Sequence, residues 1–179
     1  MLDNTLIAAI ISALNAGLAA IGQSSILVQQ AYQPTQQGVN TNPTIYLYKI
    51  GDERMGSVYR DNVWNANTST MVYTETQQYL TTFQFSALAI QDPSNTTSLT
   101  AADIVNYAAA VMQSLATITT LQAAGIGILK IGQVRNPPFV DDRGRYEYAP
   151  NFDCVFSTKQ VISSTQPIIN KTVVQVYDV

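Results

Sequence analysis

The sequence from Gly132 to Thr158 reads GQVRNPPFVDDRGRYEYAPNFDCVFST and holds the strongest local signals in the chain. Its two adjacent prolines near the start, Pro137 and Pro138, cannot continue a helix or a central strand, so they predict a loop. The loop continues through Asp141-Asp142-Arg143-Gly144-Arg145, where paired acids favour a turn and glycine permits a positive φ. Charges of both signs therefore gather at a loop tip, a pattern more typical of contact with a partner than of catalysis.

The residues that follow this loop predict a half-buried strand from Tyr146 to about Ile162. Phe152, Cys154 and Phe156 fall on one face, because successive side chains of a strand point to opposite faces of the sheet. Cys154 is the single cysteine of the chain. Its place on the apolar face predicts a buried, unreactive thiol rather than a nucleophile.

Composition excludes several classes of function. The chain has no histidine and one cysteine, which removes the commonest general base, nearly all zinc sites, and the Cys-His and Ser-His-Asp arrangements. The net charge of -3 argues against phosphate binding as the main activity, because nucleic-acid surfaces need clustered Lys and Arg.

One constellation leaves a small metal-dependent hydrolase open as an alternative. Asp141, Asp142, Glu147 and Asp153 supply carboxylates, and such an enzyme needs several oxygen ligands converging on one cation. Adjacent aspartates in a turn usually point apart, however, and the neighbouring arginines are ready partners. We therefore expect no metal site, no cofactor and no enzymatic activity.

Charged residues are scarce and unevenly placed. They make up 12% of the chain, about half the share that is typical of a soluble domain. None occurs from Asn4 to Tyr48 or from Ile104 to Leu129. Because a monomer needs charged surface to stay in solution, this shortage indicates a subunit whose flanks are covered by neighbours.

The first of two predicted helices has Asp3 as its N-cap, runs to about Ile21 and stops at Gly22. One face is apolar, as expected for a helix that packs on a core. The other face is rich in alanine and carries no charge, so either a second protein layer covers it or it is left in solvent. The missing basic start and the acidic Asp3 argue against a signal peptide, and we expect no contact with a membrane.

A second helix is predicted from a capping box at Thr100 and Asp103 to about Ala124, where Gly125 ends it. Five further strands are predicted around the two helices. They run from Ile26 to Tyr32, Thr44 to Ile50, Met55 to Trp64, Met71 to Phe85 and Ile126 to Val134, with Gly51 to Arg54 as a turn between the second and third.

The run from Val72 to Ile90 would span roughly 60 Å if it were fully extended, well beyond a typical strand. Either a bulge near Ser86 breaks it, or part of the hairpin projects from the body. The fold class is therefore α+β, a single domain over residues 1–179. It has a mixed or antiparallel sheet with a long hairpin, packed against two helices. Residues 162–179 are a possible C-terminal strand extension, which would finish the sheet or add to a neighbour's edge.

Three runs of sequence, taken with this order of elements, carry a family resemblance. They are TIYLYKIG from Thr44, YLTTFQF from Tyr79, and VDDRGRYEYAPNFD from Val140. From about Leu6 to Ile162 the chain resembles the neck or tail terminator proteins of tailed bacteriophages. The resemblance implies a structural virion protein with no catalytic residues. Such proteins form a hexameric ring that ends the tail tube and joins tail to neck, while DNA passes through the lumen.

The resemblance also implies the partners and the location. Copies of the same chain, the tail tube, sheath proteins and neck or connector proteins would be the partners, and genomic DNA would pass without specific binding. The protein would reside in the virion after assembly in the host cytoplasm. Another neck component, namely a stopper, a collar or a tail completion protein, is the first alternative, and a monomeric binding module is another. The candidate residues for contacts within or between rings are Arg54, Arg60, Asp141, Asp142, Arg143 and Arg145.

Overall fold

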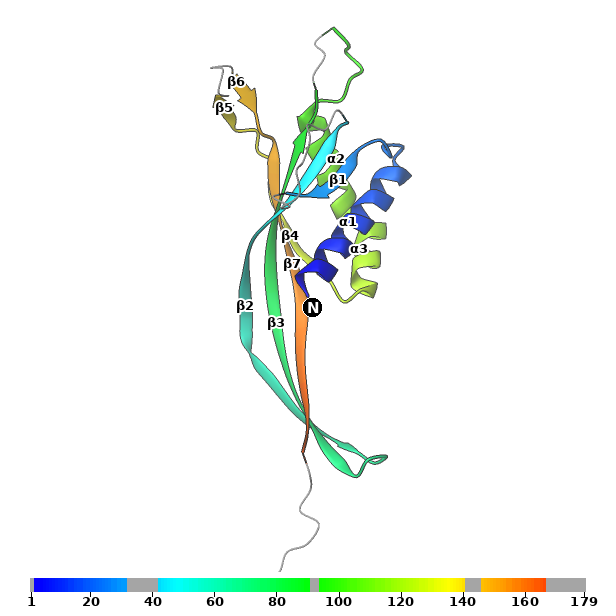
Figure 1. Ribbon diagram of the computed structural model, residues 1–179, viewed down its shortest axis with the longest axis vertical. Coiled ribbons are helices and arrows are strands. Elements are labelled where there is room, and N and C mark those ends of the chain that lie inside the picture. The colour runs from blue at the N-terminus through cyan, green and yellow to red at the C-terminus, as the bar shows by residue number, and fades with distance from the viewer. Residues whose placement is uncertain (1, 32–41, 91–93, 141–145, 167–179) are drawn as a thin grey trace, which may run out of the picture.

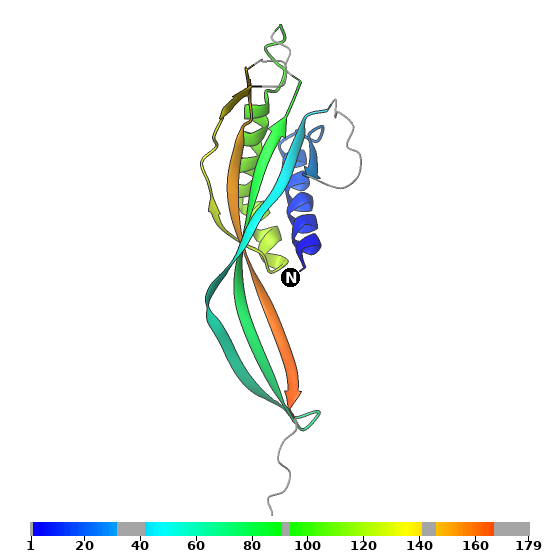
Figure 2. The same ribbon diagram turned by 60° about the vertical axis from the view of Figure 1, so that its left-hand side comes forward.

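The computed structural model describes residues 2–31, 42–90, 94–140 and 146–166. Three helices lie side by side on one face of a five-stranded sheet, and together they form a two-layer body (Figures 1 and 2). The three longest strands continue beyond the helices as a long projection. This shape selects the second of the two predicted alternatives, in which part of the hairpin leaves the body.

The helices and strands are as follows. The helices are α1 (Asp3–Ala20), α2 (Ala101–Gln113) and α3 (Leu115–Ala123). The main sheet contains β1 (Leu27–Gln30), β2 (Thr44–Asn65), β3 (Thr70–Leu88), β4 (Gly127–Ile131) and β7 (Asn151–Gln166), in the order β1-β2-β3-β7-β4. β1 is parallel to β2, and the other pairs are antiparallel. β5 (Pro138–Val140) and β6 (Tyr146–Tyr148) form a separate two-stranded sheet. The predicted α+β class with a mixed sheet is confirmed.

Four phenylalanines on β3 and β7 form the centre of the core between sheet and helices. Phe85 and Phe152 stack with ring centroids 4.9 Å apart, and Phe83 meets Phe156 edge to face at 5.9 Å. The predicted apolar face of β7 is confirmed, because Phe152, Cys154 and Phe156 are all fully buried. Burial raises the pKa of the Cys154 thiol to about 12, so the thiol stays protonated and unreactive.

Burial alternates along β7 only as far as the helices reach. Every second residue from Phe152 to Thr158 is buried, and every residue from Lys159 to Gln166 is exposed. β2 behaves in the same way and has no buried residue after Leu47. Buried and exposed residues alternate along a strand only where one face of the sheet is covered. No described helix covers the projection, so the alternation ends there.

β2 corrects one prediction. The two strands expected on either side of a turn at Gly51 to Arg54 are one strand of 22 residues. Lys49 lies opposite Phe83 and Asp52 lies opposite Thr81, so three steps along β2 match two along β3. This is a β-bulge, and it reverses which side chains face the helices. The change of pattern that suggested a turn is therefore the bulge.

The bulge expected near Ser86 is also wrong. β3 pairs with β7 without any register shift from Ser86 opposite Asn151 to Met71 opposite Gln166. The predicted strand from Tyr146 is in fact two strands, β6 and β7, because Ala149 and Pro150 interrupt it. The predicted C-terminal strand beyond Gln166 lies outside the described residues.

The helices correct two further predictions. The single second helix is two helices bent by 60° at Ser114, whose Oγ accepts a hydrogen bond from the Thr117 amide at 3.3 Å and so caps α3. Asp3 lies in the first turn of α1, and Leu2 is the N-cap. The capping box is confirmed, since Thr100 and Asp103 each accept a hydrogen bond from the other's amide.

The glycines predicted to end the helices, Gly22 and Gly125, have φ of 78° and 75° and thus take the left-handed conformation that glycine adopts without strain. By length and composition alone, α1 is apolar enough to cross a membrane, as are α2 and α3 if taken as one bent span. In this fold α1 buries six side chains in the core: Leu6, Ile7, Ile10, Ala13, Leu14 and Leu18.

Gly17 allows α1 to approach α2, and this contact gives a first prediction. A Cβ at Gly17 would lie 2.2 Å from Cγ1 of Val111, which is buried. In an open helix, Gly17→Ala would stabilise by up to about 1 kcal/mol. Here we expect overpacking to win, with a net loss of about 1 to 2 kcal/mol in the free energy of unfolding measured in urea.

Val111→Ala supplies the matched control, because it removes the atom that would clash. The cost of Gly17→Ala should be smaller in the Val111→Ala background than in the wild type. Equal costs in the two backgrounds would mean that the two helices do not meet at Gly17.

Candidate assembly surface

The helices of the body do not cover the projection, which we call the arm. It consists of Gly51–Asn65 of β2, Thr70–Leu80 of β3 and Thr158–Gln166 of β7 (Figure 1). Its exposed large apolar side chains are Met55, Val58, Tyr59, Val63, Trp64, Val161 and Ile162. Apolar side chains gathered in this way on a soluble protein mark a contact surface.

These apolar side chains lie on both faces of the arm. The register places Trp64, Met71 and Ile162 on the face that is continuous with the core. Val63 and Val161 lie on the opposite face. Each is the immediate neighbour of a core-side residue, Trp64 or Ile162, and successive side chains of a strand point to opposite faces. Neither face of the arm is therefore a purely polar, solvent-facing surface.

The two predicted contact arginines of the arm are held on its core-side face. Arg60 Nε donates to Glu75 Oε1 at 3.0 Å, and the Tyr73 hydroxyl donates to the same oxygen at 2.6 Å. The hydrogen bonds from Tyr73 and then from Arg60 hold the pKa of Glu75 below its usual value, and the bond to Glu75 raises the pKa of Arg60. The Arg54 guanidinium lies 5.8 Å from the centre of the Tyr79 ring, a cation–π contact.

The other four predicted contact residues, Asp141, Asp142, Arg143 and Arg145, lie outside the described residues. The strands on either side of them, β5 and β6, lie at the end of the molecule away from the arm tip (Figure 1). Arg54 and Arg60 are therefore not brought together with the strands that border the predicted loop. A role for any of the six in assembly remains a prediction.

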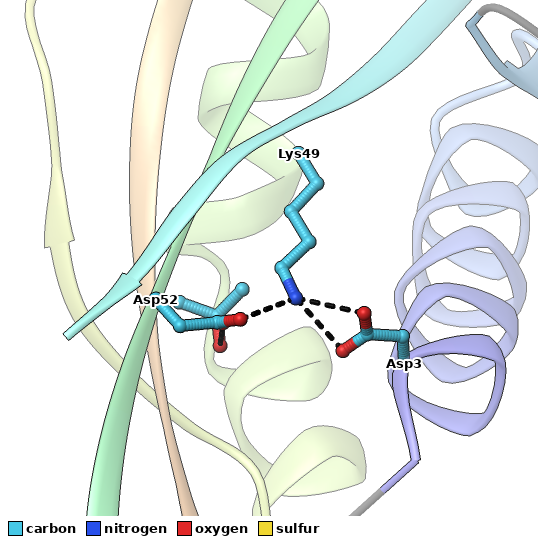
Figure 3. A network of polar contacts seen from close by, with 4 residues as sticks. Asp3, Lys49 and Asp52 are labelled. Carbon is cyan, nitrogen blue, oxygen red and sulfur yellow. Dashed lines mark hydrogen bonds and ion pairs between the residues drawn. The ribbon is translucent and has the colours of Figure 1, made fainter. Parts of the chain in front are cut away.

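A charged network that sequence reasoning missed lies where the arm leaves the body (Figure 3). Lys49 Nζ lies 2.9 and 2.8 Å from the two carboxylate oxygens of Asp3 and forms an ion pair with Asp52. Thr81 Oγ1 donates to the other oxygen of Asp52 at 2.7 Å. The network ties the first turn of α1 to the first bulge of β2.

The network depends on that bulge. Residues three apart on a regular strand point to opposite faces, so Lys49 and Asp52 would be separated without it. Burial lowers the pKa of Lys49, but the hydrogen bonds and charges of Asp3 and Asp52 outweigh burial, and the pKa is raised. Partial burial raises the pKa of Asp52, but the hydrogen bonds from Lys49 and Thr81 outweigh burial and lower it.

The described residues offer little to a small ligand or a metal ion. Two surface hollows among them have volumes of about 170 and 160 Å³, below the roughly 300 Å³ at which ligand pockets usually begin. No group of three or more His, Cys, Asp or Glu among the described residues could hold a metal ion. Asp153 of the hydrolase alternative instead accepts hydrogen bonds from Arg135 at 2.6 Å and Gln84 at 3.2 Å.

An uncovered arm with apolar side chains on both faces indicates a surface for contact with other proteins. The chain belongs to the family of the E217 gateway protein gp29, whose family model matches residues 5–168. This family consists of structural proteins of the phage neck and connector. No curated protein matches the chain. The predicted class, a structural protein of the phage neck, is therefore confirmed, whereas the match does not single out a terminator.

The network gives a prediction for the pH dependence of stability. The pKa of Asp52 is depressed below 3.8. The ionised carboxylate therefore contributes to the free energy of unfolding above that pH, and this contribution is lost as the pH falls through the folded-state pKa. The pKa of Lys49 is raised above 10.5. The charged ammonium group therefore contributes to the free energy of unfolding at neutral pH, and this contribution is lost as the pH rises through the raised pKa.

Asp52→Asn should lower the free energy of unfolding at neutral pH by no more than about 1 kcal/mol, because the pair is partly exposed and screened by water. The difference between wild type and variant should shrink as the pH falls from about 5 to about 2, because the pKa of Asp52 lies below its ordinary value of 3.8. Thermal unfolding of both proteins over this range measures it. A difference that stays constant over the range would show that the ionised Asp52 has no role.

Proposed function

We propose that this chain forms a ring, hexameric as in terminator proteins, that ends the tail tube and joins the tail to the neck while DNA passes through its lumen. The family supplies the location in the neck. The observation that carries the proposal is the arm, whose apolar side chains are exposed on both faces. A subunit of a ring buries such surfaces against its neighbours.

The proposed partners follow from this position. Copies of the same chain form the ring, the tail tube and the sheath lie on one side, and neck or connector proteins lie on the other. The protein resides in the virion after assembly in the host cytoplasm. Genomic DNA passes without specific binding, and the net charge of -3 disfavours adhesion of DNA to the ring.

The six predicted contact residues fall into two groups, and each group has a proposed role. Arg54 and Arg60 lie on the arm and contribute to the register between neighbouring subunits. Asp141, Asp142, Arg143 and Arg145 lie between β5 and β6 in the sequence, and we assign them to the contact with the next ring. A stopper, a collar or a tail completion protein is the alternative, and the docking position on the tail would distinguish it from a terminator.

The experiment is the assembly state, measured by light scattering coupled to size exclusion over a concentration series, with electron microscopy of large species. We expect hexameric rings, or a monomer that forms rings at high concentration or on tail tubes. The double variant Trp64→Lys and Ile162→Lys should weaken assembly at least about tenfold, since two apolar arm contacts are lost. A strictly monomeric protein that does not bind tail tubes would contradict the proposal.

Leu115→Lys is the matched comparison, because Leu115 is an exposed apolar residue on α3, outside the arm. Assembly of this variant should remain close to that of the wild type. An equal loss in both variants would move the subunit contact from the arm to the helices.

A further inference from the structure

The fold covers the edges of its sheet in the body and leaves them open in the arm. β1 pairs with Thr44–Leu47 of β2, and β4 pairs with Cys154–Ser157 of β7. Both edge strands lie in the body and do not continue into the arm (Figure 2). Beyond them, the arm parts of β2 and β7 pair only with β3 among the described residues (Figure 2).

The open edge of β7 lacks the features that usually prevent strands from associating. Natural edge strands are protected by charges, prolines, bulges or shortness. From Thr158 to Gln166 there is no proline or glycine, Lys159 is the single charged residue, and the pairing with β3 has no register shift. Val161 and Ile162 are 57% and 59% exposed. Such a regular edge is a template for another strand.

The open edge of β2 becomes equally regular near its end. Irregularities occur between Lys49 and Gly51 and between Met55 and Tyr59. From Tyr59 to Asn65 the strand then pairs with β3 residue by residue. The last seven residues of β2 therefore form a second straight edge, on the other side of β3 from β7.

We propose that Thr158–Ser163 of one copy pairs with Arg60–Asn65 of a second copy through backbone hydrogen bonds. This proposal rests on the ring of the proposed function. A ring of more than two copies needs a contact between two different surfaces of the subunit, whereas pairing of β7 with its own copy would close a dimer. Within one chain β3 separates the two edges, so this pairing is possible only between copies.

The direction of the strands suits this arrangement. β2 and β7 are both antiparallel to β3, so they run in the same direction. Subunits that repeat around an axis with their arms aligned would therefore join β7 to β2 as a parallel pair. The edge of β2 already accepts a parallel partner, because β1 pairs with it in the body.

One parallel register satisfies charge and apolar contacts together. When Lys159 lies opposite Asp61 of the second copy, Val161 lies opposite Val63 and Ile162 lies opposite Trp64. Lys159, Val161, Asp61 and Val63 all belong to the face away from the core, and Ile162 and Trp64 belong to the core side. A shift by one residue would place every pair on opposite faces, so this register is specified.

Cross-linking between two variants, each with one introduced cysteine, tests the pairing and its register. Val63→Cys and Val161→Cys replace exposed residues, and native Cys154 is buried with a pKa raised to about 12, so it should not react. A mixture of the two variants, treated with a short bis-maleimide, should give covalent dimers, and each variant alone should give none. A mixture of Val161→Cys with Tyr59→Cys is the control, because the thiols would be about 13 Å out of register along the strand.

Reversal of the proposed ion pair gives a second test that needs no cross-linker. Asp61→Lys should weaken assembly by about threefold or more, and Lys159→Asp in the same chain should restore it. Failure of the second substitution to restore assembly would overturn the register.

The outcomes separate this inference from the proposed function. Rings without cross-linked dimers in the Val63→Cys and Val161→Cys mixture would overturn the edge pairing and leave the ring intact. Covalent dimers formed by the Val161→Cys variant alone would overturn the pairing of β7 with β2 and would indicate a two-fold contact between two copies of β7. A protein that forms no ring and binds no tail tube would overturn the proposed function and the pairing together.

Discussion

The unbroken pairing of β3 with β7 is the constraint on which the rest of the structure depends. The two strands keep one register from Ser86 opposite Asn151 to Met71 opposite Gln166. In the body, Phe85 of β3 stacks on Phe152 of β7 and Phe83 meets Phe156 edge to face, so the two strands give the helices an apolar surface to bury. The same ladder then continues into the arm without helices, so the arm is a direct extension of the core sheet.

The junction between body and arm combines a backbone irregularity with a charge network. The bulge after Lys49 brings Lys49 and Asp52 to the same face of β2, and Asp3 approaches from the start of α1. No charged residue occurs from Asn4 to Tyr48. Lys49 and Asp52, which follow this stretch, therefore meet at the point where β2 ceases to bury apolar side chains. Ion pairs suit this place, because it is partly exposed and needs no full desolvation of the charges.

Local signals could be predicted from the sequence, and long-range ones could not. The apolar face of Phe152 to Phe156, the capping box at Thr100 and the helix-ending glycines each depend on neighbouring residues. The continuous β2 was missed because a bulge and a turn change the alternation in the same way. The break at Ser114 was missed because the surrounding residues keep a helical composition. Lys49 and Asp3 are 46 residues apart, so no spacing rule could join them. Arg54 and Arg60 were named as candidate contact residues from the sequence, but their partners Tyr79 and Glu75 depend on the register of β2 on β3.

The central claim is that the open edges of the arm are the surfaces through which copies of this chain assemble. Hydrogen exchange, measured by mass spectrometry at concentrations below and above assembly, tests it most directly, because backbone amides that gain a partner exchange more slowly. The account predicts that assembly slows exchange in peptides covering Tyr59–Asn65 and Thr158–Gln166, while the body strands stay unchanged. Slowing confined to the outer faces of α1, α2 and α3, with both arm edges unchanged, would contradict it.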